Sequence, residues 1–160
     1  MDLIVKLLGI LSAEFKTAVI AAMPIIELRG AIPFGISYGL SPVHAFVVSF
    51  LGSMLPVPIL LLGIRPVFKI LSQTPLLKKW VDHLSVRSIR KSKNIKKYGF
   101  LGLLIFVAIP LPGTGVWSGT LAAALLDIRF KTAFPAILIG NFIAGMVIMA
   151  ISYGIINVII

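Results

Sequence analysis

The chain has 160 residues, enough for one domain, and 59% of them are hydrophobic while only 12% are charged. That charged share is about half of the average for soluble proteins, so the chain lacks the polar residues that would cover a water-soluble core. Ten of its fifteen Lys and Arg residues fall between Arg65 and Lys97. The net charge of +10 therefore indicates a cytoplasmic loop of a membrane protein rather than a nucleic-acid-binding surface. The chain contains no cysteine, which excludes disulfides and thiolate metal sites.

The first of two interrupted apolar stretches runs from Ala13 to Leu40 and is broken by charges, prolines and glycines: Pro24, Glu27, Arg29, Gly30, Pro33, Gly35 and Gly39. It is followed by Ser41 to Gly63, which exceeds the roughly 20 residues that one helical membrane crossing needs. Pro56 and Pro58 predict a kink near the end of that crossing.

The second interrupted stretch runs from Gly99 to Leu126 and contains the run Pro110-Leu111-Pro112-Gly113-Thr114-Gly115. The helical piece from Gly99 to Ile109 reaches about 16 Å, half of a hydrocarbon core of roughly 30 Å. Trp117 to Leu126 is about as short. Two half-length arms around a turn predict a re-entrant hairpin, and Lys131 to Val158 then predicts a full crossing.

Charge placement favours the re-entrant path over a full crossing of the second hairpin. Arg129 and Lys131 follow that hairpin. A re-entrant path returns them to the side of the Arg65–Lys97 loop, as the positive-inside rule prefers, whereas a full crossing places them on the opposite side.

The two halves of the chain have similar motifs. Ala22-Met23-Pro24 matches Ala108-Ile109-Pro110, and Ala45-Phe46 precedes Gly52-Ser53 with the spacing by which Ala133-Phe134 precedes Gly140-Asn141. Chance similarity between apolar segments is the alternative. We expect an all-α membrane protein with two inverted repeats, each a surface helix, a re-entrant helical hairpin and one full transmembrane helix. The single membrane domain, 1–160, divides into a first repeat at 1–63, a basic cytoplasmic loop at 64–98 and a second repeat at 99–160.

Glu27 and Arg29 are the charges expected at membrane depth, where either costs about 2.5–3.5 kcal/mol on the insertion scale. They are two residues apart and so do not share one helical face. Either the backbone is irregular there, or each charge has a partner elsewhere. Glu27 can bind a proton or cation and Arg29 an anionic group, or the two can form a structural ion pair that pins the hairpin.

The second hairpin supplies neutral site candidates. The amides of Gly113, Thr114 and Gly115, ahead of a helix N-terminus, can receive an anion, or the glycines serve close packing alone. Trp117 and Asn141 are secondary candidates for which packing and interhelical hydrogen bonding are the simpler roles. No grouping of residues resembles a metal site or a catalytic triad, so we expect neither an enzyme nor a metal or other cofactor.

Two segments carry a family resemblance, Pro24-Ile25-Ile26-Glu27-Leu28-Arg29-Gly30-Ala31-Ile32-Pro33 and Phe106-Val107-Ala108-Ile109-Pro110-Leu111-Pro112-Gly113-Thr114-Gly115. The chain resembles the prokaryotic small multidrug export protein family over nearly its whole length. That family looks related to the DedA (VTT) superfamily, which implies inverted hairpin-plus-helix repeats and transport of phospholipids or polyprenyl phosphate, with a glutamate of the first hairpin corresponding to Glu27. Here a second acid after that hairpin and the arginines of the second hairpin are missing, so the lipid-phosphate substrate does not follow directly.

These observations predict a small secondary transporter or lipid translocase in a prokaryotic plasma membrane, proton-coupled through Glu27 and moving an anionic lipid or lipid phosphate. Its site would lie between the two hairpins and include Pro24, Pro110 and Pro112. A multidrug exporter and a non-transporting membrane scaffold are the alternatives. Membrane lipids are the expected partners, together with a second copy in a homodimer, because so few helices bury little surface.

Overall fold

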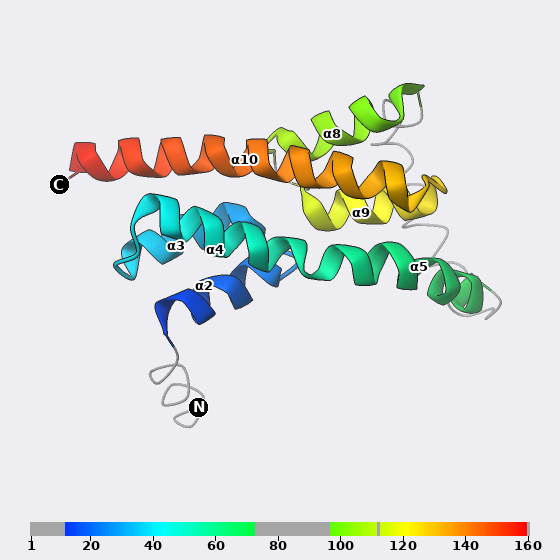
Figure 1. Ribbon diagram of the computed structural model, residues 1–160, viewed down its shortest axis with the longest axis horizontal. Coiled ribbons are helices and arrows are strands. Elements are labelled where there is room, and N and C mark those ends of the chain that lie inside the picture. The colour runs from blue at the N-terminus through cyan, green and yellow to red at the C-terminus, as the bar shows by residue number, and fades with distance from the viewer. Residues whose placement is uncertain (1–11, 73–96, 112, 160) are drawn as a thin grey trace. The chain divides into compact units, whose positions relative to one another are not determined.

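The computed structural model describes residues 12–72, 97–111 and 113–159, and within these ranges the chain forms helices and turns and no strand (Figure 1). The prediction of an all-α protein is confirmed for this part of the chain. The predicted surface helices and Pro112 lie outside the described residues, as does most of the predicted basic loop. The helices are α2 (Ala13–Ala22), α3 (Glu27–Ser37), α4 (Pro42–Met54), α5 (Pro56–Ser72), α8 (Phe100–Ala108), α9 (Val116–Leu125) and α10 (Phe130–Ile159).

The first interrupted stretch forms two short helices, α2 and α3. The Ser12 side chain caps α2 by accepting a hydrogen bond from the Phe15 amide at 3.3 Å. The helix ends at Ala22, and the next residue, Met23, has an extended backbone (φ −72°, ψ 140°). A residue before proline is pushed out of the helical region by the proline ring, so Pro24 explains why α2 stops there.

The second interrupted stretch breaks for the same reason. α8 ends at Ala108, and the next residue, Ile109, is extended (φ −77°, ψ 119°) and precedes Pro110. The turn that follows contains Gly113 (φ 81°) and Gly115 (φ 138°), both in conformations that favour glycine. α9 then starts at Val116. The predicted helical pieces on either side of the break are confirmed to within one residue at each end.

Two helical segments are long and apolar enough to cross a membrane, Pro42–Ile64 and Phe130–Ile155. They correspond to the predicted crossings. The first consists of α4 and the start of α5, which are joined at Leu55 in a helical conformation. Pro56 is the first residue of α5, where a missing amide proton costs least.

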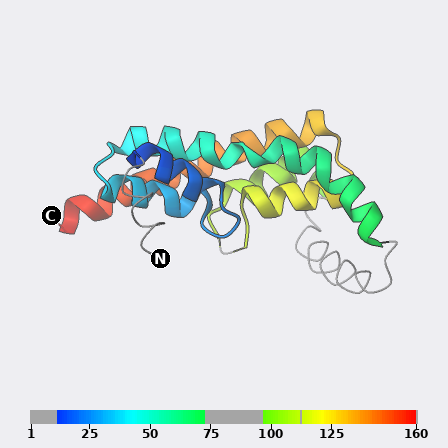
Figure 2. The same ribbon diagram turned by 90° about the horizontal axis from the view of Figure 1, so that it is seen from below.

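The chain divides into two compact units, Met1–Leu55 with Phe142–Ile160, and Pro56–Asn141. In the first unit α2, α3 and α4 pack together (Figure 2) around Leu28, Ile32 and Phe46. The Phe46 ring meets Phe142 of α10 edge-on, with 5.4 Å between ring centroids. Gly52 allows close packing on α2, because a Cβ there would lie 2.5 Å from the Ala18 carbonyl oxygen.

The second unit is built on the α8–α9 pair, with α5 packed against α9. Two glycines let its helices approach closely. A Cβ at Gly119 would lie 2.5 Å from Val107, and one at Gly140 would lie 2.6 Å from the carbonyl oxygen of Leu104. Small residues at such contacts are typical of helices that pack inside a membrane, where close backbone approach replaces the hydrophobic effect as a source of stability.

Candidate functional site

Glu27 is the first residue of α3, and its backbone is unusual. Its φ is 53°, in the left-handed region, which is uncommon for any residue other than glycine. The side chain is buried, with 7% of its surface exposed. The Glu27 amide donates a hydrogen bond to the Met23 carbonyl at 3.1 Å, which closes the turn between α2 and α3. Backbone strain of this kind costs about 1–3 kcal/mol and is concentrated at functional sites.

Arg29 lies two residues further along α3 and is half-buried. Its guanidinium and the Glu27 carboxylate interact electrostatically. Leu28 between them is almost fully buried in the core of its unit. Of the two arrangements that the sequence left open, the irregular backbone at Glu27 is therefore present. The structure brings Glu27 and Arg29 together, and Pro24 lies exposed in the turn just before them.

The turn from 109 to 115 is held together by the Thr114 side chain. Its hydroxyl lies 2.7 Å from the Ile109 carbonyl oxygen and 2.8 Å from that of Leu111, and it accepts a hydrogen bond from the Leu111 amide at 3.3 Å. The Thr114 amide donates to the Leu111 carbonyl at 3.1 Å. Both polar groups of Thr114 are thus engaged within the turn, so its contribution in this structure is to shape the turn. Anion binding by the Gly113 and Gly115 amides stays a prediction.

The remaining predicted residues lie in the second unit. Pro110 is exposed in the same turn, and Trp117 is half-buried near the start of α9. Asn141 is buried on α10 with 2% of its surface exposed, directly after the glycine that packs against α8. In the described part of the chain no group of three His, Cys, Asp or Glu side chains is placed to hold a metal ion.

A family model described as "Putative small multi-drug export protein" matches residues 27–147. The matched region begins at Glu27 and covers α3 to the middle of α10, about three quarters of the chain. The chain belongs to this family. The resemblance inferred from the two proline-containing segments is thereby confirmed. No curated protein and no solved structure matches the chain.

Membership of the small multi-drug export family explains why the two long helices leave most of their apolar surface exposed. Only 39% of the most apolar window of Pro42–Ile64 and 33% of that of Phe130–Ile155 is buried inside the protein. Large apolar side chains project outward along the first helix at regular intervals: Val43, Val47, Leu51, Leu55, Ile59 and Leu62. A continuous apolar face of this length is poorly tolerated in water. Together with the export family, it indicates a membrane protein.

One polar residue of the first unit was missed by sequence reasoning. Ser49 of α4 is fully buried. Its hydroxyl oxygen has no hydrogen-bond partner within the part of the chain that the structure describes. Ser53, one turn later, is also buried but donates to the Phe50 carbonyl at 3.0 Å. Two serines four residues apart in an otherwise apolar span are the signal that was available, since interhelical contacts in membranes favour small polar residues.

Proposed function

We propose that this protein is a small secondary exporter of a prokaryotic plasma membrane, which moves small organic molecules outward in exchange for protons. The observation that carries the proposal is Glu27, a buried carboxylate in a left-handed backbone conformation at the start of α3. An ionisable residue at membrane depth is costly and marks ion or substrate pathways. The export family supports the transport class.

Glu27 can couple the outward movement of substrate to the inward movement of protons, because substrate and proton compete for the same carboxylate. A carboxylate binds either a proton or a cationic group of the substrate, because protonation removes the charge that attracts the cation. Entry of a proton therefore releases the substrate, and loss of the proton prepares the site for the next molecule. Such a scheme needs a single titratable group whose ligands exclude one another. Arg29 lies beside the carboxylate and interacts with it electrostatically.

The second candidate is translocation of an anionic lipid or lipid phosphate, and Arg29 favours it. A half-buried guanidinium next to a proton-binding carboxylate suits bidentate recognition of a phosphate. In this scheme protonation of Glu27 frees Arg29 from its electrostatic partner so that Arg29 can hold the headgroup. Both candidates require the carboxylate, and they differ in which of the two charges meets the cargo.

The architecture that we propose with this function keeps both helical hairpins re-entrant and inverted with respect to each other. The broken helices α2–α3 and α8–α9 support it, because such backbone is stable at membrane depth only when it is buried in protein or lines a watery cavity. The Gly113 and Gly115 amides would supply the polar groups of the second hairpin. We also retain the homodimer as part of this proposal.

Transport by reconstituted protein tests the function. Wild type, Glu27→Gln and Glu27→Asp are placed in liposomes, and efflux of a fluorescent organic cation is followed after a pH jump. We expect wild type to respond to the gradient, Glu27→Gln to lose the response, and Glu27→Asp to retain part of it. Glu14→Gln is the matched control, because it makes the same chemical change near the start of α2 and should transport normally.

A parallel measurement separates the two candidates. Fluorescent phosphatidylglycerol in the same liposomes reports lipid movement between leaflets, and Arg29→Lys tests bidentate recognition. Export of cations with no lipid movement supports the first candidate, and lipid movement that Arg29→Lys abolishes supports the second. A Glu27→Gln variant that is folded and as active as wild type in both assays would remove the carboxylate from the mechanism. Neither movement in folded wild-type protein would point to the scaffold.

A further inference from the structure

Two fully buried hydroxyl groups lie in the core of the first unit, on α2 and α4. The Thr17 hydroxyl of α2 donates to the Ala13 carbonyl at 2.7 Å, within its own helix. The Ser49 hydroxyl of α4 has no hydrogen-bond partner in the described part of the chain. A buried polar group without a protein partner costs stability, so a protein that keeps one uses it for an ordered water or for function.

The contacts of two neighbouring residues of α4 place Ser49 in this core. One turn before Ser49, the Ala45 side chain lies 3.1 Å from where a Cβ on Gly35 would be, and Thr17 lies 3.0 Å from the same point. Three residues after Ser49, Gly52 packs against the backbone of α2. Positions 45, 49 and 52 share one face of a helix. Ser49 therefore faces the junction at which α4 meets α2 and α3.

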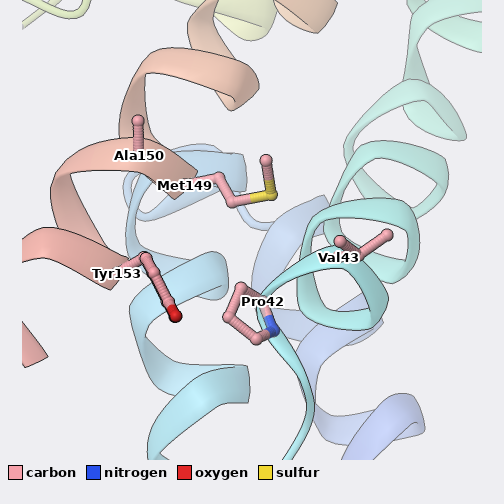
Figure 3. A pocket seen from close by; sticks show the side chains of 5 residues that line it. All are labelled: Pro42, Val43, Met149, Ala150 and Tyr153. Atoms are coloured by element: carbon pink, nitrogen blue, oxygen red, sulfur yellow. The ribbon is translucent and has the colours of Figure 1, made fainter. Parts of the chain in front are cut away.

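The contact of α4 with α10 has a different character. Phe46 of α4 meets Phe142 of α10 edge-on. Figure 3 shows the groove that these two helices line near the start of α4, and none of its side chains carries a charge. Its lining residues are Pro42, Val43, Met149, Ala150 and Tyr153. The contact with α10 is thus mainly apolar and aromatic, whereas buried hydroxyls lie at the junction with α2 and α3.

The close contact between α2 and α4 has a counterpart between α8 and α10 of the second unit. A Cβ on Gly52 would lie 2.5 Å from the Ala18 carbonyl oxygen of α2. A Cβ on Gly140 would lie 2.6 Å from the Leu104 carbonyl oxygen of α8. In each unit a long helix therefore approaches the first arm of a helical hairpin through a glycine, and the two contacts can be compared residue by residue.

The comparison shows that this contact does not need hydroxyl groups. Three residues before each glycine lie Ser49 in the first unit and Ile137 in the second. One residue before each carbonyl lie Thr17 in the first unit and Leu103 in the second. All four side chains are fully buried. Apolar residues therefore build the same contact in the second unit, so packing alone does not explain the two hydroxyls of the first.

The two hydroxyls lie in the unit that also carries the buried acid. α3 and α4 pack together and are joined by the short turn at 38–41, so they form an antiparallel hairpin. From the contact of Gly35 with Ala45, Glu27 lies eight residues back along α3 and Ser53 lies eight residues onward along α4. Both are about 12 Å from that contact along the helices, which puts Glu27 and the buried Ser53 at the same level.

We propose that Thr17, Ser49 and Ser53 form a pathway of hydroxyl groups that carries protons through the first unit to Glu27, with water molecules between them. The inference rests on the export function proposed above. Ser49 and Ser53 are four residues apart, a rise of about 6 Å, which one water spans with two hydrogen bonds of about 2.8 Å each. Polar groups at membrane depth typically mark such proton routes.

Each step of the pathway moves one proton and leaves the hydroxyl groups unchanged. A protonated water gives a proton to a hydroxyl oxygen, and that hydroxyl releases its own proton to the next water. The last water protonates the Glu27 carboxylate. Thr17 and Ser53 already donate to carbonyls, but a hydroxyl oxygen also accepts. Ser49 has no protein partner in the described residues, so both its donor and its acceptor can serve the waters.

Two transport rates of the full-length protein in liposomes, with ethidium as the probe, test the pathway. Efflux driven by a pH gradient requires proton movement, whereas exchange of labelled for unlabelled ethidium at equal pH does not. Ser49→Ala and Thr17→Val each remove one hydroxyl with little change of volume. We expect both variants to lose gradient-driven efflux about tenfold, the effect of one lost hydrogen bond on a rate, and to keep wild-type exchange. Ser49→Thr retains a hydroxyl and should recover most of the efflux.

Thr120→Val is the matched control, because it makes the same chemical change as Thr17→Val in the second unit. Thr120 is also fully buried, and its hydroxyl also donates to a carbonyl four residues back, that of Val116 at 2.6 Å. We expect both rates of Thr120→Val to equal those of wild type. The monodisperse fraction of each variant in detergent reports its folding.

Different outcomes overturn the pathway and the export function. Wild-type efflux by folded Ser49→Ala overturns the pathway and leaves the export function intact. An equal loss of efflux and exchange in Ser49→Ala assigns Ser49 to packing, and a loss of efflux in Thr120→Val as large as in Thr17→Val removes the specificity; either result overturns the pathway. Absence of gradient-driven efflux in wild type refutes the export function itself. If Ser49→Ala does not fold, Ser49→Cys replaces it under the same criteria, because a thiol forms only weak hydrogen bonds.

Discussion

Replacement of Gly52 by alanine tests how tightly α2 and α4 are packed. The new Cβ would lie 2.5 Å from the Ala18 carbonyl oxygen and 2.9 Å from the Ala18 Cα. Both are backbone atoms of α2, so no side-chain rotation can relieve the contact. The two helices must move apart, and the neighbouring contacts of Ser49 and Ser53 on the same face of α4 must loosen with them.

The magnitude follows from a matched glycine elsewhere. Gly63 lies in α5, and a Cβ there would meet no atom within 4 Å. Alanine in place of a helical glycine stabilises by about 1 kcal/mol through helix propensity alone. Overpacking costs about 1–3 kcal/mol. We therefore expect Gly63→Ala to stabilise by about 1 kcal/mol, and Gly52→Ala to range from no net change to a loss of about 2 kcal/mol.

Thermal unfolding in one detergent, followed by tryptophan fluorescence and by the monodisperse fraction after heating, compares the two variants with wild type. The double variant should show the sum of the two effects, since separate sites are usually additive. A Gly52→Ala protein as stable as Gly63→Ala would refute the close approach of α4 to α2. The same result would also argue against a first-unit core formed by α2, α3 and α4.

Three further predictions concern other parts of the chain. Thr114→Val should destabilise by about 1–3 kcal/mol in the same unfolding assay, because the turn loses the hydroxyl that binds its carbonyls, while Thr114→Ser should restore most of the loss. The Glu14 pKa lies below its ordinary value of 4.5, because its own backbone amide and Ser12 stabilise the carboxylate, so the stability that Glu14 contributes should be lost as pH falls below 4.5, and Glu14→Gln should lose less stability over that range than wild type. Single cysteines at Ser92 and Lys131 should be labelled from the same side of intact cells, as a re-entrant second hairpin requires; labelling from opposite sides would exclude that hairpin.

The helix breaks were predictable because proline acts locally. Pro24 and Pro110 each force the preceding residue into an extended conformation, and the observed ends of α2 and α8 fall directly before those residues. The two long apolar helices were predictable from the length of their apolar stretches. Both the proline breaks and the apolar lengths are local properties of the sequence, so the predicted and observed helix bounds agree. The electrostatic pairing of Glu27 and Arg29 was predictable as one of two possibilities, since each charge in an apolar stretch needs a partner.

Other features depend on the geometry of particular turns and helix contacts, which the residue types alone do not determine. Glutamate has no preference for left-handed backbone, so φ at Glu27 is set by the tight turn around it. The Thr114 amide was a candidate anion donor, yet it donates to the Leu111 carbonyl within the turn. The missing partner of Ser49 depends on how α4 packs, and the division into two units at Leu55 falls within a continuous apolar stretch.

Position 27 requires both a left-handed backbone, which favours glycine, and a carboxylate, which glycine lacks. Glycine would relieve the backbone strain of about 1–3 kcal/mol, but it would remove the carboxylate. Directed evolution for thermal stability alone should therefore drift toward glycine at position 27, whereas selection for the proposed export activity should keep the acid there. Such a divergence between the two selections is the expected mark of a residue whose activity opposes stability. Laboratory evolution of this small protein can thus separate activity from folding at a single codon.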